Sequence, residues 1–146
     1  MKIFGANDHA ATELKEEVVK LLKSREIEVI NLGTDSSDSV HYPEYASKLA
    51  LEVAKSGERG ILMCGSGIGV SIVANKYQGI RAALCKTEED ARLSRQHNNA
   101  NVLCLGSRVS TIEEIRAMIN CWLDTEFEGG RHQLRVDMIS KLGTKV

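Results

Sequence analysis

Short apolar runs alternate with amphipathic stretches along the whole of this sequence. Residues 10–23 place Leu14, Val18, Leu21 and Leu22 at the spacing of a helix with one buried face. Residues 60–64 form a short, continuously apolar run, typical of a parallel strand that is buried on both faces. Repeated along the chain, the two patterns predict strands over residues 2–6, 28–32, 60–64, 81–85 and 101–105, and helices over 10–23, 43–55, 70–76, 87–96, 110–123 and 131–141.

Local signals support several of these boundaries. Pro43, the only proline, suits the first turn of a helix. Thr87, with Asp90 three residues later, resembles a capped helix start, and Ser110 with Glu113 reads as a capping box. The pair Gly129-Gly130 breaks the chain before a last helix that carries Leu134, Met138 and Leu142.

Strands that alternate with helices predict an α/β protein with a five-stranded parallel sheet, covered by helices on both faces. We expect one domain over residues 1–146. In such a fold, binding sites lie beyond the carboxyl ends of the strands. The last helix has no strand after it, and it could pack on its own domain or reach onto a second subunit.

Composition narrows the class of function. The formal net charge is −1 and aromatic residues make up 4% of the chain, which argues against a nucleic-acid partner or an anionic membrane surface. We find no signal peptide and no apolar run of about 20 residues, and we expect a cytoplasmic protein. The four cysteines form no CxxC pair and have no histidine at metal-ligand spacing, so we predict reduced thiols and no bound metal.

The strongest local signal is the segment 64–69, Cys-Gly-Ser-Gly-Ile-Gly, which joins a buried strand to a helix. Such a turn presents backbone N–H groups at a helix start, where anions bind. Cys64 would feel the same dipoles as a thiolate able to attack a carbonyl or remove a proton. Alternatively, the segment is a tight turn without a ligand and Cys64 an inert core residue. It is neither a P-loop nor a standard dinucleotide fingerprint. We interpret Cys85, Cys104 and Cys121 as core residues.

Three further groups could carry chemistry. Asp8 and His9 end the first strand at the same sheet edge as Cys64 and could bind sugar hydroxyls or phosphate, although Asp8 could also simply cap a helix. His97 follows a helix and precedes the fifth strand, at the opposite edge, so it could meet Cys64 only across two subunits. Arg131 and Arg135 share one helix face, either as a phosphate clamp or as solvated side chains.

Together these motifs resemble the type B ribose-5-phosphate isomerase family, which includes galactose-6-phosphate isomerase subunits. The resemblance covers nearly the whole chain. Its motifs occur in one order: Asp8-His9, Thr34 with His41-Tyr42-Pro43, the segment 64–69, Ser94 to Asn98, and Glu128 to Gln133. It implies a doubly wound, Rossmann-like α/β/α fold. It also implies a homodimer, or a homotetramer made of two dimers, with active sites at the subunit interface.

The resemblance also implies roles for individual residues. Cys64 matches the base that moves a proton between C2 and C1, and His97 matches the group that assists ring opening, with Asp8 as a possible partner. Substrate-binding positions match Asp8, His9, Asn98 and the turn Gly65, Ser66, Gly67, Ile68 and Gly69, whose N–H groups would stabilise an enediolate. Arg131 and Arg135 match the phosphate clamp. Ser66 stands where many relatives have threonine, and Asn7 where some have cysteine.

The expected activity is therefore a metal-free and cofactor-free interconversion of ribose 5-phosphate and ribulose 5-phosphate. Galactose-6-phosphate isomerase subunits often lack the cysteine or the histidine at these positions. This chain has both Cys64 and His97, which favours a pentose phosphate as its substrate. A hexose 6-phosphate isomerase, acting on allose or galactose 6-phosphate, is the main alternative. Two further interpretations are a non-catalytic nucleotide- or flavin-binding module and a structural subunit that pairs with a catalytic homologue.

Overall fold

The computed structural model describes residues 1–143 and contains one five-stranded, all-parallel sheet with strand order β2-β1-β3-β5-β4. The strands are β1 (Lys2–Asn7), β2 (Glu28–Asn31), β3 (Arg59–Cys64), β4 (Ala82–Leu84) and β5 (Val102–Gly106). The connecting elements are η1 (His9–Ala11), α1 (Thr12–Ser24), α2 (Tyr42–Ser56), α3 (Ile68–Ala74), α4 (Glu88–Asn98), α5 (Ile112–Asp124) and α6 (Arg131–Ser140). The predicted doubly wound α/β/α class is confirmed.

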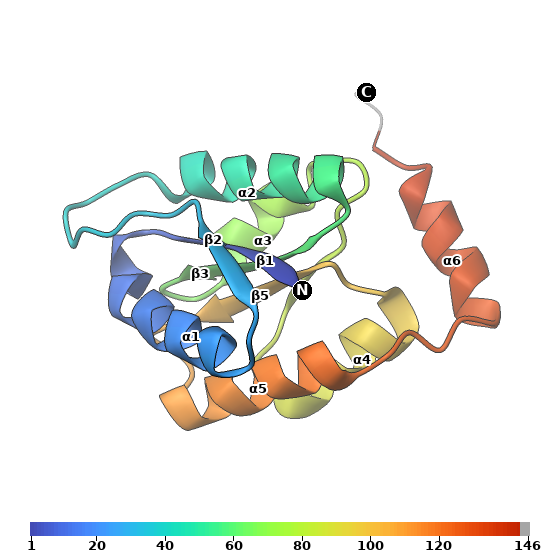
Figure 1. Ribbon diagram of the computed structural model, residues 1–146. Helices are drawn as coiled ribbons and strands as arrows, with labels where there is room; N and C mark the ends of the chain where they lie inside the picture. Colours follow the sequence, from blue (N-terminus) through green and yellow to red (C-terminus); the bar gives the residue numbers. More distant parts are fainter. Residues whose placement is uncertain (144–146) are drawn as a thin grey trace.

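The helices cover both faces of the sheet (Figure 1). On one face, Leu49 and Val53 of α2 and Val70 of α3 pack against inward-facing strand residues such as Leu62. On the other, α1, α4 and α5 enclose a second core that includes Trp122. The apolar stripe predicted over residues 10–23 faces this second core, because Leu14, Val18 and Leu22 are all buried there.

Helix α5 starts one residue later than the predicted capping box. Thr111 is the N-cap: its Oγ1 accepts from the N–H of Glu114 at 3.2 Å, and the N–H of Thr111 donates to Glu114 Oε1 at 2.8 Å. The sequence Ser-Thr-Ile-Glu-Glu contains two overlapping boxes, and the prediction based on Ser110 and Glu113 is wrong. The box at Thr87 and Asp90 is confirmed.

Two other boundaries also differ. The first helix begins with a 3₁₀ turn, because Asp8 accepts from the N–H of Ala10 through its side chain and from the N–H of Ala11 through its carbonyl. Helix α4 continues to Asn98 and ends where Asn99 adopts a left-handed conformation (φ 47°). His97 and Asn98 therefore lie in the last helical turn rather than after it.

A cluster of arginines lies at the amino-terminal ends of the central strands. The guanidinium carbons of Arg59 and Arg95 lie 5.3 Å and 6.0 Å from the Trp122 ring centroid. Arg95 is buried and donates to the carbonyls of Ala100 and Thr125. Burial, together with the positive charges of Arg59 and Arg81, lowers the pKa of Arg95 to about 10. Within residues 1–143, neither Arg59 nor Arg95 forms an ion pair with a carboxylate.

Helix α6 stands apart from the three layers, beyond the end of α4 (Figure 1). Only its His132 and Val136 are buried. The predicted apolar positions Leu134, Met138 and Leu142 are instead 67%, 60% and 69% exposed, so their own chain leaves most of their surface uncovered. Across residues 1–143, the helices are too short or too polar to span a lipid bilayer.

The overlapping boxes at the start of α5 can be separated by mutation. Thr111→Ala should lower the free energy of unfolding by about 1 kcal/mol, because it removes the N-cap oxygen. Ser110→Ala should leave it within about 0.5 kcal/mol, because the Ser110 hydroxyl is buried without a partner among the described residues. Urea denaturation measures both values. Equal losses would show that the two hydroxyls share the cap.

Candidate active site

The segment 64–69 forms one wall of an open cleft of about 560 Å³ at the carboxyl end of β3. Cys64, Gly65, Ser66, Ile68 and Gly69 all line it. The N–H of Gly67 donates to Cys64 Sγ at 3.1 Å, and a donor in this position binds a negatively charged sulfur more strongly than a neutral thiol. Cys64 therefore borders a cavity large enough for a small phosphorylated sugar and is not sealed in the core.

Two of the glycines are required by close contacts. Gly67 has φ +80°, and a Cβ there would lie 2.7 Å from Leu84 and 3.0 Å from the carbonyl carbon of Leu105. A Cβ on Gly69 would lie 2.5 Å from the ring of Tyr42, which lines the same cleft. The turn thus needs glycine for both its backbone conformation and its packing.

Asp8 and His9 lie at the same sheet edge. Asp8 lines the cleft, is 8% exposed, and also caps η1 through its bond from the N–H of Ala10. Both interpretations of Asp8 given by the sequence are therefore compatible. His9 is half-buried, and its Nδ1 accepts from the N–H of Val40 at 3.1 Å.

The cleft contains a cation that the sequence analysis missed. Arg108 lines it, and a Cβ added at Gly65 would lie 3.2 Å from Arg108 Nη1. Arg108 follows β5, whose end adjoins the end of β3, through the pairing of Cys64 with Gly106. The rule that sites gather at the carboxyl ends of parallel strands could have identified Arg108, although no motif surrounds it.

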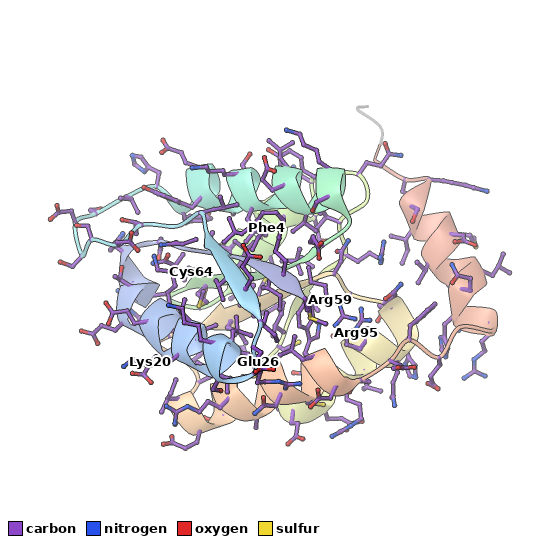
Figure 2. All side chains as sticks on the ribbon, in the orientation of Figure 1. Phe4, Lys20, Glu26, Arg59, Cys64 and Arg95 are labelled. Atoms are coloured by element: carbon purple, nitrogen blue, oxygen red, sulfur yellow. The ribbon has the colours of Figure 1, made fainter. Side chains whose placement is uncertain are left out.

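The remaining predicted residues lie at the opposite side of the molecule. His97 and Asn98 end α4, and Arg131 and Arg135 lie exposed on α6. Among the described residues, the lining of the Cys64 cleft includes none of these four. Figure 2 shows Cys64 toward one end of the sheet and Arg95, from the same helix as His97, toward the other. A single chain therefore does not bring Cys64 and His97 together, as the topology predicted.

His97 has two neighbours that sequence reasoning did not identify. Its Nε2 lies 3.4 Å from Glu128 Oε1, and its ring stacks on His132 with centroids 4.3 Å apart and planes inclined by 12°. The N–H of Glu128 also donates to the carbonyl of Gln96, which ties the segment before α6 to α4. The sequence places Glu128 and His132 in one motif with Arg131, and that proximity was the available signal.

These three side chains are also potential metal ligands, since their donor atoms lie within 4.8 Å of one another. Imidazole lone pairs lie in the ring planes, so the nearly parallel rings of His97 and His132 do not direct their nitrogens toward a common ion in this arrangement. The trio fits a metal poorly, and the expectation of a metal-free site stays a prediction.

The other cysteines differ from Cys64 in their surroundings. Burial raises the pKa of Cys104 well above its usual value, and burial together with Asp90 raises that of Cys85 to about 12. Both are buried thiols, as predicted. Cys121 is only half-buried, and its Sγ lies near the carbonyl of Glu88, so its assignment to the core is wrong.

The turn can be tested by comparing two glycines with positive φ. Gly67→Ala should lower the free energy of unfolding by about 3 kcal/mol or more, since it combines left-handed strain with crowding. Gly57→Ala is the control: φ is +76° but nothing lies within 4 Å, so about 1–2 kcal/mol is expected. Chemical denaturation measures both. Equal losses of unfolding free energy in the two variants would show that crowding by Leu84 and Leu105 adds nothing to the cost at Gly67.

His132 should make stability depend on pH. Burial of its ring, followed by the nearby His97 and Arg131, lowers the pKa of His132 from its usual 6.5. The unfolded chain then takes up a proton first as the pH falls. Stability contributed by neutral His132 is complete above pH 6.5 and is lost below it, toward the lower pKa of the folded protein.

We therefore expect His132→Phe, which keeps an aromatic ring against His97, to lose less free energy of unfolding than the unmodified protein between roughly pH 7.5 and 5.5. Urea denaturation across this range is the measurement. Parallel profiles for the two proteins would remove His132 as the source of the dependence.

Comparison with known proteins gives a consistent result. The sequence profile described as Ribose/Galactose Isomerase matches residues 3–139. Ribose-5-phosphate isomerase B of Escherichia coli (strain K12) is 50% identical over 143 residues, which cover 97% of this chain and 95% of that protein. A putative sugar phosphate isomerase of Bacillus subtilis (strain 168) is 46% identical over 143 residues, covering 96% and 95%.

Solved structures agree with the sequence matches. Ribose-5-phosphate isomerase B of Clostridium thermocellum superposes with a TM-score of 0.93 at 48% identity, covering 97% of this chain and 96% of that one. The Mycoplasma genitalium enzyme, solved with bound ribulose 5-phosphate, has a TM-score of 0.93 at 43% identity, covering 96% and 94%. The chain with a cysteine cleft at one sheet edge and a histidine–arginine cluster at the other therefore belongs to the ribose/galactose isomerase family.

Proposed function

We propose that this protein interconverts ribose 5-phosphate and ribulose 5-phosphate, with Cys64 as the base. The observation that carries the proposal is the position of Cys64. Its sulfur borders an open cleft and accepts an N–H from the glycine turn, in a chain half identical to a ribose-5-phosphate isomerase B. The single-domain organisation proposed for residues 1–146 is supported by the one sheet that the five strands form.

The sugar ring must open before isomerisation, because the ring hides the carbonyl carbon. His97 would exchange a proton with the ring oxygen or the anomeric hydroxyl, with Asp8 on the cleft side as a partner. The carboxylate of Glu128 lies 3.4 Å from Nε2 of His97 and would help to hold the imidazole in place during this exchange.

In the open sugar, the Cys64 thiolate would remove the proton on C2. The electrons of that C–H bond form the C1–C2 double bond, and negative charge collects on O1. The sulfur then returns its proton to C1, while the hydroxyl proton passes from O2 to O1, which leaves the ketose. The N–H groups of the turn would stabilise the enediolate, and one such donor is typically worth about 2.7–4 kcal/mol.

Phosphate binding falls to the arginines. Arg131 and Arg135 project from one helix and have no carboxylate partner among the described residues. Arg108 adds a guanidinium on the Cys64 side. A phosphate dianion held between these arginines would place C1 and C2 of the sugar at the sulfur. The binding energy of the phosphate would then orient the reacting carbons.

We propose that two copies of this chain complete each site. The Cys64 cleft is bordered by exposed Ile68, Ile72 and Val109, and α6 exposes Leu134 and Met138 beside the two arginines. Pairing α6 of one copy with the cleft of another would bury both apolar sets and join Cys64 to His97. A homodimer or homotetramer follows, with small sugar phosphates as ligands.

The four free cysteines support a reducing, cytoplasmic location.

The base assignment predicts the behaviour of Cys64→Ala. Turnover of ribose 5-phosphate should fall at least about 10³-fold, because no other group replaces the proton carrier. Cys121→Ala is the matched control, since it removes a half-buried thiol outside the cleft and should retain activity. Rates are measured for both variants with a panel of pentose and hexose phosphates. Near-normal turnover by Cys64→Ala would contradict the assignment of Cys64 as the base. Faster turnover of a hexose phosphate by the unmodified protein would contradict ribose 5-phosphate as the substrate.

The shared site predicts complementation between two inactive variants. Mixed subunits of Cys64→Ala and His97→Asn, refolded together, should recover about a quarter of the unmodified activity, because half of the random dimers contain one intact site of two. The control replaces His97→Asn with the double variant Cys64→Ala/His97→Asn, which leaves every site without the thiol. No recovery in the first mixture would contradict a site built from two copies.

A further inference from the structure

Lys15 is a buried cation that the reaction does not use. Its side chain is 5% exposed on α1, and Nζ donates to Asn31 Oδ1 at 3.1 Å, to Asp35 Oδ1 at 2.6 Å and to the carbonyl of Thr34. An ammonium has three N–H donors, and here all three are used. Every acceptor belongs to the segment 31–35, so this one side chain binds the end of β2 and the start of the next loop.

The loop of residues 33–41 is attached to the same helical segment at two more points. Thr12 Oγ1 donates to the carbonyl of Ser36 at 2.8 Å, and the N–H of Val40 donates to His9 Nδ1 at 3.1 Å. His9, Thr12 and Lys15 are spaced by three residues, which places them along one side of η1 and α1. Figure 1 shows the loop projecting beyond the sheet beside this segment.

The bond to Val40 decides the form of the His9 ring. A nitrogen that accepts an N–H carries no proton, so His9 is neutral at Nδ1 and carries its proton on Nε2. The Nε2–H is then left as a hydrogen-bond donor. His9 directly follows Asp8 in the chain, and Asp8 lines the Cys64 cleft. If the loop moved away, either nitrogen could hold the proton and the ring could rotate.

We propose that Lys15 is a positioning residue: by holding Thr34 and Asp35 it keeps the loop in place, so that Val40 fixes His9 as the Nε2–H donor that meets the substrate. Neither Lys15 nor His9 belongs to the cleft lining in the single chain, and Asp8 is the neighbour that does. The effect on substrate rests on the proposed function, whereas the effect on the His9 ring does not.

The surroundings of Lys15 indicate which of its bonds matters. Asp35 is 77% exposed, and ion pairs with exposed partners contribute little. Thr34 is buried, and its carbonyl lies against a buried Nζ, so removal of the ammonium leaves a buried acceptor unpaired. Lys15→Met keeps most of the apolar stem and removes only the donors. The expected response is therefore a displaced loop rather than a collapsed core.

The test compares Lys15→Met with Lys20→Met, which removes a 73%-exposed lysine from the same helix (Figure 2). Nitrogen NMR of the imidazole rings at about pH 8 reports the tautomer of His9 in the free protein, and the His9→Gln spectrum assigns its signals. We expect one Nε2–H form in the unmodified protein and in Lys20→Met, and mixed tautomers in Lys15→Met. KM for ribose 5-phosphate should rise about tenfold in Lys15→Met, with kcat changed less than about threefold.

A folded Lys15→Met with a single His9 tautomer and an unchanged KM would overturn the proposal. If this variant does not fold, Thr12→Val replaces it under the same two criteria, because it removes a second loop attachment without a buried charge. If the unmodified protein has the expected His9 signals but no activity on ribose 5-phosphate, the proposed function fails while the role of Lys15 is still decided by the spectra.

Discussion

The sheet is parallel throughout, and this shared strand direction decides at which edge of the sheet each candidate site residue lies. Residues that follow strands meet at one edge, and residues that precede strands meet at the other. Cys64, Asp8 and Arg108 belong to the first group, and His97 belongs to the second. The α6 arginines precede no strand; they lie on the His97 side because the segment before α6 is bound to α4. The separation of Cys64 from His97 is thus a consequence of topology. Activity that requires both groups requires a second chain.

Much of this arrangement could be predicted from the sequence. Apolar periodicity located all five strands to within a residue or two, because a strand buried on both faces leaves a short, unbroken apolar run. The glycine segment pointed to the Cys64 cleft, because a glycine-rich turn between a buried strand and a helix presents backbone N–H groups at the carboxyl end of the sheet. The strand order β2-β1-β3-β5-β4 was not predicted, because periodicity contains no information on which strands are neighbours.

What could not be predicted depends on contacts between distant positions. Arg108 lies on an exposed turn and reaches the cleft only because β5 adjoins β3. Lys15 looks like an ordinary polar position between Leu14 and Glu16, yet its ammonium is buried by a loop about twenty residues away. The choice between Ser110 and Thr111 as N-cap depends on how the turn after β5 packs, which two overlapping sequence boxes cannot reveal.

The stacking of Arg59 and Arg95 near Trp122 has a consequence for how ligands approach. A π-face stabilises a cation without cancelling its charge, whereas a carboxylate would neutralise it. Arg81 lies close enough to Arg95 to lower its pKa, so three guanidinium groups gather at this end of the molecule although the whole chain carries a formal net charge of −1. A cluster of guanidinium groups of this kind attracts anions from solution, and dissolved salt weakens that attraction.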